Sequence, residues 1–206
     1  MMKTATTETN PVPANGIKSS ESQSVAGFAL PRVGNSSDDL RLVAGMQIPR
    51  IGNGYDVHAL APGLPFFLGG LRLDHPKGCV AHSDGDCLIH AVCDALLGAL
   101  ALGDIGTHFP DNSEEFRGID SKILLKRTYD MIRATGYRPG NVDCTVCLQA
   151  PKISHRIPEM RAVMAGILEI PQDRISVKAT TTEYLGFVGR EEGIAVYATV
   201  LLWPVG

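Results

Sequence analysis

Apolar and polar positions alternate in several short segments after residue 48, which is the pattern of half-buried β-strands. Residues 50–57 predict a strand that ends in polar side chains, and residues 65–68 and 71–73 predict a tight hairpin around Gly69 and Gly70. Further strands are predicted at residues 141–148, 175–179 and 194–203.

The strongest helical pattern covers residues 86–102. Its apolar residues fall at positions 88, 91, 92, 95, 96 and 99, and Gly103 then ends the helix. Ser83 and Asp86, three residues apart, predict a capping box at its start. The sequence therefore predicts a largely buried helix that begins beside a group of polar residues.

Two further helices are predicted at residues 121–134 and 158–168, the second with Pro158 near its first turn. Long loops are predicted at residues 103–119 and 180–192. There is no internal repeat, and strands and helices are mixed along the chain. The sequence therefore predicts a single α+β or mixed-sheet domain.

The first 48 residues lack this patterning. They contain ten Ser or Thr residues and one aromatic residue, and four basic residues balance four acidic ones. This composition is typical of a disordered tail. These residues lack the apolar segment of a secretory signal. The alternative interpretation is a plastid transit peptide, although transit peptides are usually poor in acidic residues. We therefore divide the chain into a tail, residues 1–48, and a domain, residues 49–206.

Composition and charge exclude several classes of protein. The chain has 206 residues, of which 44% are hydrophobic and 20% charged, so it is too apolar to be wholly disordered. The longest apolar run, residues 95–103, is too short to span a bilayer. The formal net charge of −3 provides no basic footprint for nucleic acid and no polybasic membrane anchor. No nucleic-acid or membrane partner is therefore expected.

The five cysteines are an odd number in a chain of this length, which favours reduced thiols over a disulfide scaffold. Cys144 and Cys147 form a C-x-x-C pattern, but they lie on a predicted strand. Residues three apart on a strand point to opposite faces. The pair is therefore predicted to be two ordinary cysteines and not a zinc or redox site.

Asp56, His58 and His90 are candidate metal ligands. The first two lie two residues apart on a predicted strand, so they share a face, although such a pair also occurs on ordinary surfaces. His90 shares a helical stripe with Asp86 and Asp94, among apolar neighbours. Carboxylates beside a histidine commonly orient a metal-bound imidazole. Three ligands with an open fourth position are typical of a catalytic zinc site.

A third polar cluster follows the strand predicted at residues 175–179. Thr180 and Glu183 have the spacing of a capping box, which predicts the start of a helix. A helix start offers N–H groups to a phosphate, and Glu183 offers a carboxylate to Mg²⁺. Arg190 brings a cation to the same region. Neither a P-loop nor a dinucleotide-binding glycine motif occurs.

Seven motifs, in order and at matching spacing, resemble the 2-C-methyl-D-erythritol 2,4-cyclodiphosphate synthase family over about residues 49–205. They are GYDVH at 54–58, AHSDGD at 81–86, DALLG at 94–98, GDIG at 103–106, FPD at 109–111, QAPK at 149–152 and KATTTE at 178–183. One motif alone would be weak evidence for this family, but seven motifs in the family's order are highly specific evidence.

The resemblance implies an intramolecular phosphoryl transfer that needs no protein nucleophile. The 2-phosphate of 4-diphosphocytidyl-2-C-methyl-D-erythritol 2-phosphate attacks the β-phosphorus, which gives a cyclic diphosphate and CMP. It implies Zn²⁺, or another divalent transition metal, at Asp56, His58 and His90. It also implies Mg²⁺ or Mn²⁺ with the substrate at Glu183. Asp94 is then expected to orient the zinc ligands.

The resemblance also assigns His82 and Thr181 as catalytic residues that stabilise the transition state. The substrate-binding residues that it implies are Asp56, His58, His82, Ser83, Asp104, Ile105, Gly106, Phe109, Pro110, Asp111, Asn112, Ser113, Leu148, Gln149, Ala150, Pro151, Lys152, Ile153, Ser154, Thr180, Thr181, Thr182, Glu183, Phe187 and Arg190.

The family's architecture implies a mostly β sheet covered on one side by helices, in a homotrimer with active sites between subunits. An isoprenoid diphosphate in the trimer channel, with Arg190 near its mouth, is a further implied partner. The motifs look bacterial, which favours the bacterial cytoplasm over a plastid. Residues 38–44 faintly resemble the end of a cytidylyltransferase that is fused upstream in some bacteria.

Two other functions fit the same residues. One is a zinc-dependent phosphohydrolase that uses Asp56, His58 and His90 and adds water. The other is a non-catalytic binding or assembly protein with a vestigial site.

Overall fold

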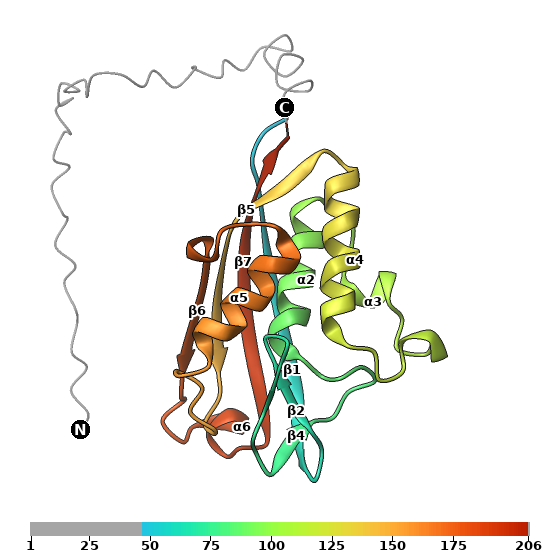
Figure 1. The fold of residues 1–206 in the computed structure, drawn as a ribbon. Coiled ribbons are helices and arrows are strands. Elements are labelled where there is room, and N and C mark those ends of the chain that lie inside the picture. The colour runs from blue at the N-terminus through green and yellow to red at the C-terminus, as the bar shows by residue number, and fades with distance from the viewer. Residues whose placement is uncertain (1–46, 206) are drawn as a thin grey trace, which may run out of the picture. The chain divides into compact units, whose positions relative to one another are not determined.

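A computed structural model describes residues 47–205, so most of the predicted tail, including residues 38–44, lies outside the described residues. The main sheet has five strands in the order β4-β1-β7-β5-β6 (Figure 1). Its pairs are antiparallel except for β5 and β6. The strands are β1 (Arg50–Pro62), β4 (Lys77–Cys79), β5 (Tyr137–Cys147), β6 (Ile175–Thr180) and β7 (Gly193–Pro204).

The three long helices are α2 (Cys87–Ala99), α4 (Ser121–Ala134) and α5 (Ile157–Leu168). In Figure 1, α2 and α5 lie in front of this sheet, and α4 lies beside α2. Their buried faces and the inward side chains of the strands form one hydrophobic core. The shorter elements are β2 (Phe66–Leu68), β3 (Leu71–Leu73), α3 (Ile105–His108), α6 (Gly186–Gly189) and two 3₁₀ turns at Glu114–Phe116 and Gln172–Arg174. The predicted α+β domain, a sheet with helices, is confirmed.

Two glycines allow α2 to lie directly against β1. A Cβ atom added to Gly52 would lie 1.8 Å from the Ala95 carbonyl oxygen, and one added to Gly54 would lie 2.0 Å from that of Ala91. Both contacts are with helix backbone, which cannot move aside as a flexible side chain can. The absence of side chains at these positions therefore sets the distance between the strand and the helix.

The predicted hairpin is confirmed, since β2 pairs with β3 around Gly69 and Gly70, which both have positive φ. The predicted bounds of the first strand and the first helix are wrong. β1 runs to Pro62, five residues beyond the prediction, because its end pairs with β4, which the sequence pattern missed. α2 ends at Ala99, because the left-handed Ala101 interrupts it before Gly103.

Both predicted capping boxes are wrong. Asp86 itself is the N-cap of α2, and its carboxylate accepts from the Ile89 N–H at 3.0 Å. Thr180 ends β6, and Glu183 lies in a turn with positive φ, so no helix starts there. The polar side chains at these positions have other partners, which are described with the site.

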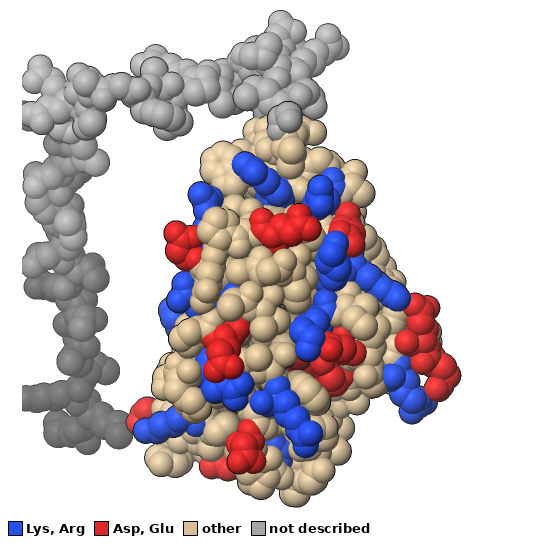
Figure 2. All heavy atoms as spheres, in the orientation of Figure 1, with Lys and Arg blue, Asp and Glu red and all other residues tan. Residues whose placement is uncertain are grey.

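The predicted geometry of the C-x-x-C pair is confirmed. All five cysteines are free, and on β5 Cys144 is buried while Cys147, on the opposite face, is partly exposed. Among the described residues, no helix combines the length and apolar character that crossing a bilayer requires. On the face drawn in Figure 2, acidic and basic side chains are interspersed, so this face has no basic patch of the kind that binds nucleic acid.

Candidate metal centre

Asp56, His58 and His90 come together where β1 continues past its glycine contact with α2. Asp56 and His58 project from the helix side of β1, and His90 lies in the second turn of α2. His58 Nε2 is 3.1 Å from Asp56 Oδ2, His90 Nδ1 is 3.3 Å from the same oxygen, and the two nitrogens are 3.1 Å apart. The three candidate ligand atoms therefore form a nearly equilateral triangle.

The triangle fits a tetrahedral metal ion. Zinc with bonds of about 2.0–2.1 Å to nitrogen and oxygen holds its ligands about 3.3 Å apart. Asp56 Oδ2 is buried and has no hydrogen bond of acceptable geometry among the described residues. A buried carboxylate oxygen without such a partner is costly, and a metal ion would satisfy it. Within residues 47–205, this is the one group of three ligand side chains that converges in this way.

The electrostatics of the triangle keep Asp56 ionised. Burial alone would raise the pKa of Asp56, but the imidazoles of His58 and His90 outweigh it and lower that pKa well below its ordinary value. Burial alone would lower the pKa of His90, and the carboxylate of Asp56 reverses this and raises it. A charged carboxylate beside two imidazoles is the donor set that binds zinc and similar transition metals.

The far side of the His90 ring is held by two serines. His90 Nε2 lies 2.9 Å from Ser121 Oγ and 3.2 Å from Ser83 Oγ. The carboxylates predicted to flank this ring bind elsewhere. Asp86 is fully buried and accepts from the N–H groups of Gly69 and Gly70 at 2.9 and 2.6 Å, as well as from Ile89.

Asp94 has a different partner from the one expected. Its Oδ1 accepts from the Ile105 N–H at 2.7 Å, and no hydrogen bond from Asp94 to His90 occurs among the described residues. The contact attaches the start of α3 to α2. Asp104 caps the same short helix, accepting from the Thr107 N–H at 2.8 Å.

A pocket of about 430 Å³ opens beside the triangle. It is lined by His58 and His90, by His82 and Ser83 from the loop before α2, and by residues of the loop that carries α3. His82 Nε2 also lies 3.0 Å from the Ser113 carbonyl oxygen, which holds the two loops together. We call this the metal pocket. The lining residues from the second loop are Ile105, Gly106, Phe109, Pro110, Asp111, Phe116 and Ile119.

Eight of the remaining predicted residues gather at a second pocket, of about 210 Å³, at the ends of β5 and β6. We call it the strand-end pocket. The buried side-chain oxygen of Gln149 has no hydrogen-bond partner among the described residues. The predicted residues that line this pocket are Leu148, Gln149, Pro151, Lys152, Ile153, Ser154, Thr180 and Thr181.

Glu183 and its neighbours lie beyond the strand-end pocket. Thr181 Oγ1 donates to Glu183 Oε1 at 2.8 Å, and Glu183 is not part of the ligand triangle. Arg190 forms a two-point ion pair with Glu192, with distances of 2.9 and 2.8 Å. The structure therefore places one group of predicted site residues at each pocket. The predicted residues that line neither pocket include Asp104, Asn112, Ser113, Ala150, Thr182, Glu183, Phe187 and Arg190.

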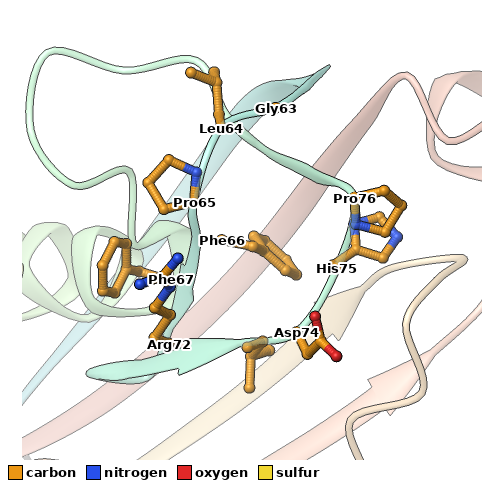
Figure 3. Close-up of a pocket in the computed structure, with 10 residues that line it drawn as sticks. Gly63, Leu64, Pro65, Phe66, Phe67, Arg72, Asp74, His75 and Pro76 are labelled. Carbon is orange, nitrogen blue, oxygen red and sulfur yellow. The ribbon is translucent and has the colours of Figure 1, made fainter.

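A larger hollow of about 800 Å³ lies at the β2–β3 hairpin, away from both groups. Figure 3 shows Phe67 and Arg72 on one side of it and Asp74 and His75 on the other. No convergent group of three metal ligands among the described residues lies there. We therefore place the chemistry at the metal pocket.

Comparison with known proteins identifies the family of the chain. A profile of the YgbB family matches residues 49–203. The chain belongs to the YgbB family. A member from Bacteroides fragilis, named 2-C-methyl-D-erythritol 2,4-cyclodiphosphate synthase, is 57% identical over 146 residues, which are 71% of this chain and 92% of that protein.

Two solved structures of this family's fold are also similar. The bifunctional IspDF from Campylobacter jejuni matches with a TM-score of 0.73 and 44% identity, over 75% of this chain and 42% of that one. IspF from Plasmodium falciparum, solved as a CDP complex, matches with a TM-score of 0.70 and 36% identity, over 79% of this chain and all of that one. The family resemblance predicted from the seven motifs is confirmed.

The sequence motifs missed two residues of the metal centre, Ser121 and Asp84. Ser121 is 31 residues from His90 and was visible only as the first residue of a predicted helix. Asp84 stood inside a motif, but nothing in the sequence connected it with Ser121, which is 37 residues away. Only the packing of α4 on α2 brings these residues together.

Proposed function

We propose that this protein converts 4-diphosphocytidyl-2-C-methyl-D-erythritol 2-phosphate to 2-C-methyl-D-erythritol 2,4-cyclodiphosphate and CMP, as a phosphorus–oxygen lyase in isoprenoid biosynthesis. The observation that carries the proposal is the Asp56, His58 and His90 triangle at the wall of a pocket lined by the family motifs. The curated relatives at 52–58% identity carry the name of this synthase.

In this reaction a 2-phosphate oxygen bonds to the β-phosphorus, and the bond from that phosphorus to the oxygen of CMP breaks. No water enters and no protein atom becomes bonded to the substrate. The protein's task is therefore to hold the two phosphates in line and to offset their charge. His82 and Ser83 line the metal pocket beside the triangle, where they would contact the phosphates.

Asp56, His58 and His90 would hold Zn²⁺ or another divalent transition metal. Bound there, the ion would supply Lewis-acid polarisation of a phosphoryl oxygen. Glu183 would hold Mg²⁺ or Mn²⁺ together with the substrate, because its carboxylate is a hard oxygen ligand suited to these ions. Thr181 donates a hydrogen bond to Glu183, which orients that carboxylate.

The substrate's two ends would occupy the two pockets of different chains. His58 pairs with Ile194 at the start of β7. Cys147, which pairs with Thr180 on one side, pairs on the other with Ala195, the next residue of β7, so both pockets lie at the same end of the sheet. β1 and β6 are three strands apart, which is roughly 14 Å at about 4.8 Å per strand. We propose a homotrimer in which the metal pocket of one subunit faces the strand-end pocket of the next.

The sheet face opposite the helices supports this assembly. It exposes apolar side chains on adjacent strands, among them Tyr55 on β1 and Tyr197 on β7, whose ring centroids are 4.8 Å apart. A large exposed apolar patch usually marks an interface. The proposed trimer would bury this face around its axis, where an isoprenoid diphosphate would bind with Arg190 near the mouth.

Residues 49–206 form the proposed synthase domain, and we propose the bacterial cytoplasm as its location. Support for the location comes from the bacterial origin of the relatives with 52–58% identity. A plastid location, with residues 1–48 as a transit peptide, is the competing interpretation.

The test is to incubate the metal-loaded protein with the cytidine-linked substrate and Mg²⁺, and to follow the products by ³¹P NMR in ¹⁸O-water. We expect CMP and a cyclic diphosphate without ¹⁸O. A linear phosphate that carries ¹⁸O would instead identify a zinc-dependent phosphohydrolase at the same site. Absence of any turnover would leave a binding or assembly protein.

A further inference from the structure

Ser121 is a fully buried serine that touches the back of a metal-ligand histidine. It is the first residue of α4, and its Oγ lies 2.9 Å from His90 Nε2. The His90 nitrogen that faces Asp56 and His58 is Nδ1, so Ser121 contacts the nitrogen that points away from the triangle.

The hydroxyl of Ser121 has only one hydrogen, and this hydrogen is donated to Asp84 in a hydrogen bond. Ser121 Oγ donates to Asp84 Oδ1, and the Ser121 N–H donates to the other oxygen, Oδ2, at 3.0 Å. Because its hydrogen is committed, Ser121 Oγ can only accept from the imidazole. The hydrogen of His90 must then lie on Nε2, which leaves the lone pair of Nδ1 free for a metal ion.

Asp84 is itself fixed by backbone contacts on both sides. Its Oδ1 also accepts from the Asp86 N–H at 3.1 Å, and its own N–H donates to the Ile119 carbonyl oxygen at 3.0 Å. These bonds connect the loop before α2 with the loop before α4. The chain Asp84, Ser121, His90 therefore runs from a rigid loop junction to the ligand triangle.

We infer that Ser121 and Asp84 are positioning residues that fix the orientation and the protonated nitrogen of His90 for metal binding. The inference rests on the metal site of the proposed function, but it does not depend on which reaction the site catalyses. Partners of this kind raise the basicity of the ligand imidazole and hold its ring in place, and their loss usually costs about 10–100-fold in metal affinity.

The first test measures zinc affinity of the full chain by competition with a chromophoric chelator. We expect Ser121→Ala to bind zinc about 10–100-fold more weakly than the unaltered protein. Thr128→Val is the matched control, since it removes another buried hydroxyl from α4, one without a hydrogen-bond partner among the described residues. It should leave zinc affinity unchanged. Equal affinity in Ser121→Ala, or an equal loss in Thr128→Val, would overturn the inference.

The second test distinguishes a fixed proton from a merely structural contact. In zinc-loaded protein with ¹⁵N-labelled histidine, His90 Nε2–H should exchange slowly with solvent. That protection should fall in Ser121→Ala, which keeps only the longer contact of Nε2 with Ser83 Oγ at 3.2 Å. It should return in Ser121→Thr, which restores the hydroxyl. Protection that persists in Ser121→Ala, or unaltered protein that binds no divalent metal, would refute the proposal. Zinc binding without CMP formation would refute the synthase reaction and leave the role of Ser121 standing.

Discussion

The two faces of β1 carry different kinds of residue. On the helix side, Gly52 and Gly54 admit α2, and Asp56 and His58 follow at the end of the same row. On the other side, the row contains Ile51, Asn53, Tyr55 and Val57, all exposed. Because successive side chains of a strand point to opposite faces, a shift of one residue exchanges the two rows. One strand therefore has the candidate metal ligands on one face and, on the other, the surface that we assign to assembly.

The largest expected effect comes from filling the glycine contact on the helix side. Gly54→Val would place side-chain atoms inside the backbone of α2, whose Ala91 oxygen lies 2.0 Å from the new Cβ. We expect the free energy of unfolding to fall by about 3 kcal/mol or more, measured by urea denaturation.

Gly98→Ala is the control for this substitution. Gly98 lies in α2 on the exposed side, and its added Cβ would approach nothing closer than 3.9 Å. It should raise stability slightly, because alanine favours a helix over glycine by about 0.5–1 kcal/mol. If Gly54→Val were as stable as the unaltered protein, the close approach of α2 to β1 would not hold.

The next largest effect is expected at His58, and it should be absent at the adjacent Val57 on the other face of β1. His58→Ala removes one of three candidate ligands, so we expect bound zinc to be lost and turnover to fall by more than about 100-fold. Loss of a hydrogen-bond partner of a ligand alone costs up to about 100-fold in metal affinity or activity, and loss of the ligand itself should cost more. Val57→Ala, one residue away on the exposed face, should retain the metal. Zinc content by elemental analysis and CMP release would measure both. Full zinc content in His58→Ala would exclude this ligand set.

A smaller effect is expected from the exposed face. Tyr197→Glu introduces a charge beside Tyr55 in the proposed trimer interface, so it should dissociate the trimer while each chain keeps its zinc. Ile123→Glu is the control, because Ile123 on α4 is 46% exposed, close to the 49% of Tyr197, but lies on the helix side of the domain. Sedimentation velocity would report the assembly. A Tyr197→Glu protein that sediments like the unaltered one would contradict the assignment of this face.

The smallest effect is expected at the strand-end pocket. Lys152→Ala removes a cation from the lining and should raise KM about tenfold with little change in kcat, which corresponds to about 1.4 kcal/mol of binding. Lys126→Ala on α4, where Lys126 pairs with Asp130, should change neither constant. An unchanged KM in Lys152→Ala would remove this lysine from the proposed substrate contacts.

The helix side of β1 was largely predictable from the sequence, because the prediction depended only on the spacing of residues within single elements. The spacing of Asp56 and His58 on a strand, and of His90 on a buried helix, indicated the candidate ligands, and the structure brings these three side chains together. The strand bounds were less predictable, since the end of β1 depends on pairing with β4, whose short Lys-Gly-Cys sequence has no strand pattern.

The hydrogen-bond partners of the ligands were not predictable, because they depend on packing between distant segments. Helical spacing suggested Asp86 and Asp94 as partners of His90, but the backbone N–H groups of Gly69, Gly70 and Ile105 occupy those carboxylates. Ser121, which together with Ser83 contacts the far side of the ring, reaches it only because α4 packs on α2.

The pairing of the first long strand with the last one has a consequence for the order of folding. Arg50 of β1 pairs with Leu202 of β7, and Ala59 pairs with Gly193, so these contacts span almost the whole domain. Contacts of such long sequence separation form slowly and late. During synthesis, Asp56 and His58 would therefore leave the ribosome before the other candidate site residues but gain their fixed positions last. The nascent chain would carry these candidate metal ligands for most of translation without a finished site to hold an ion.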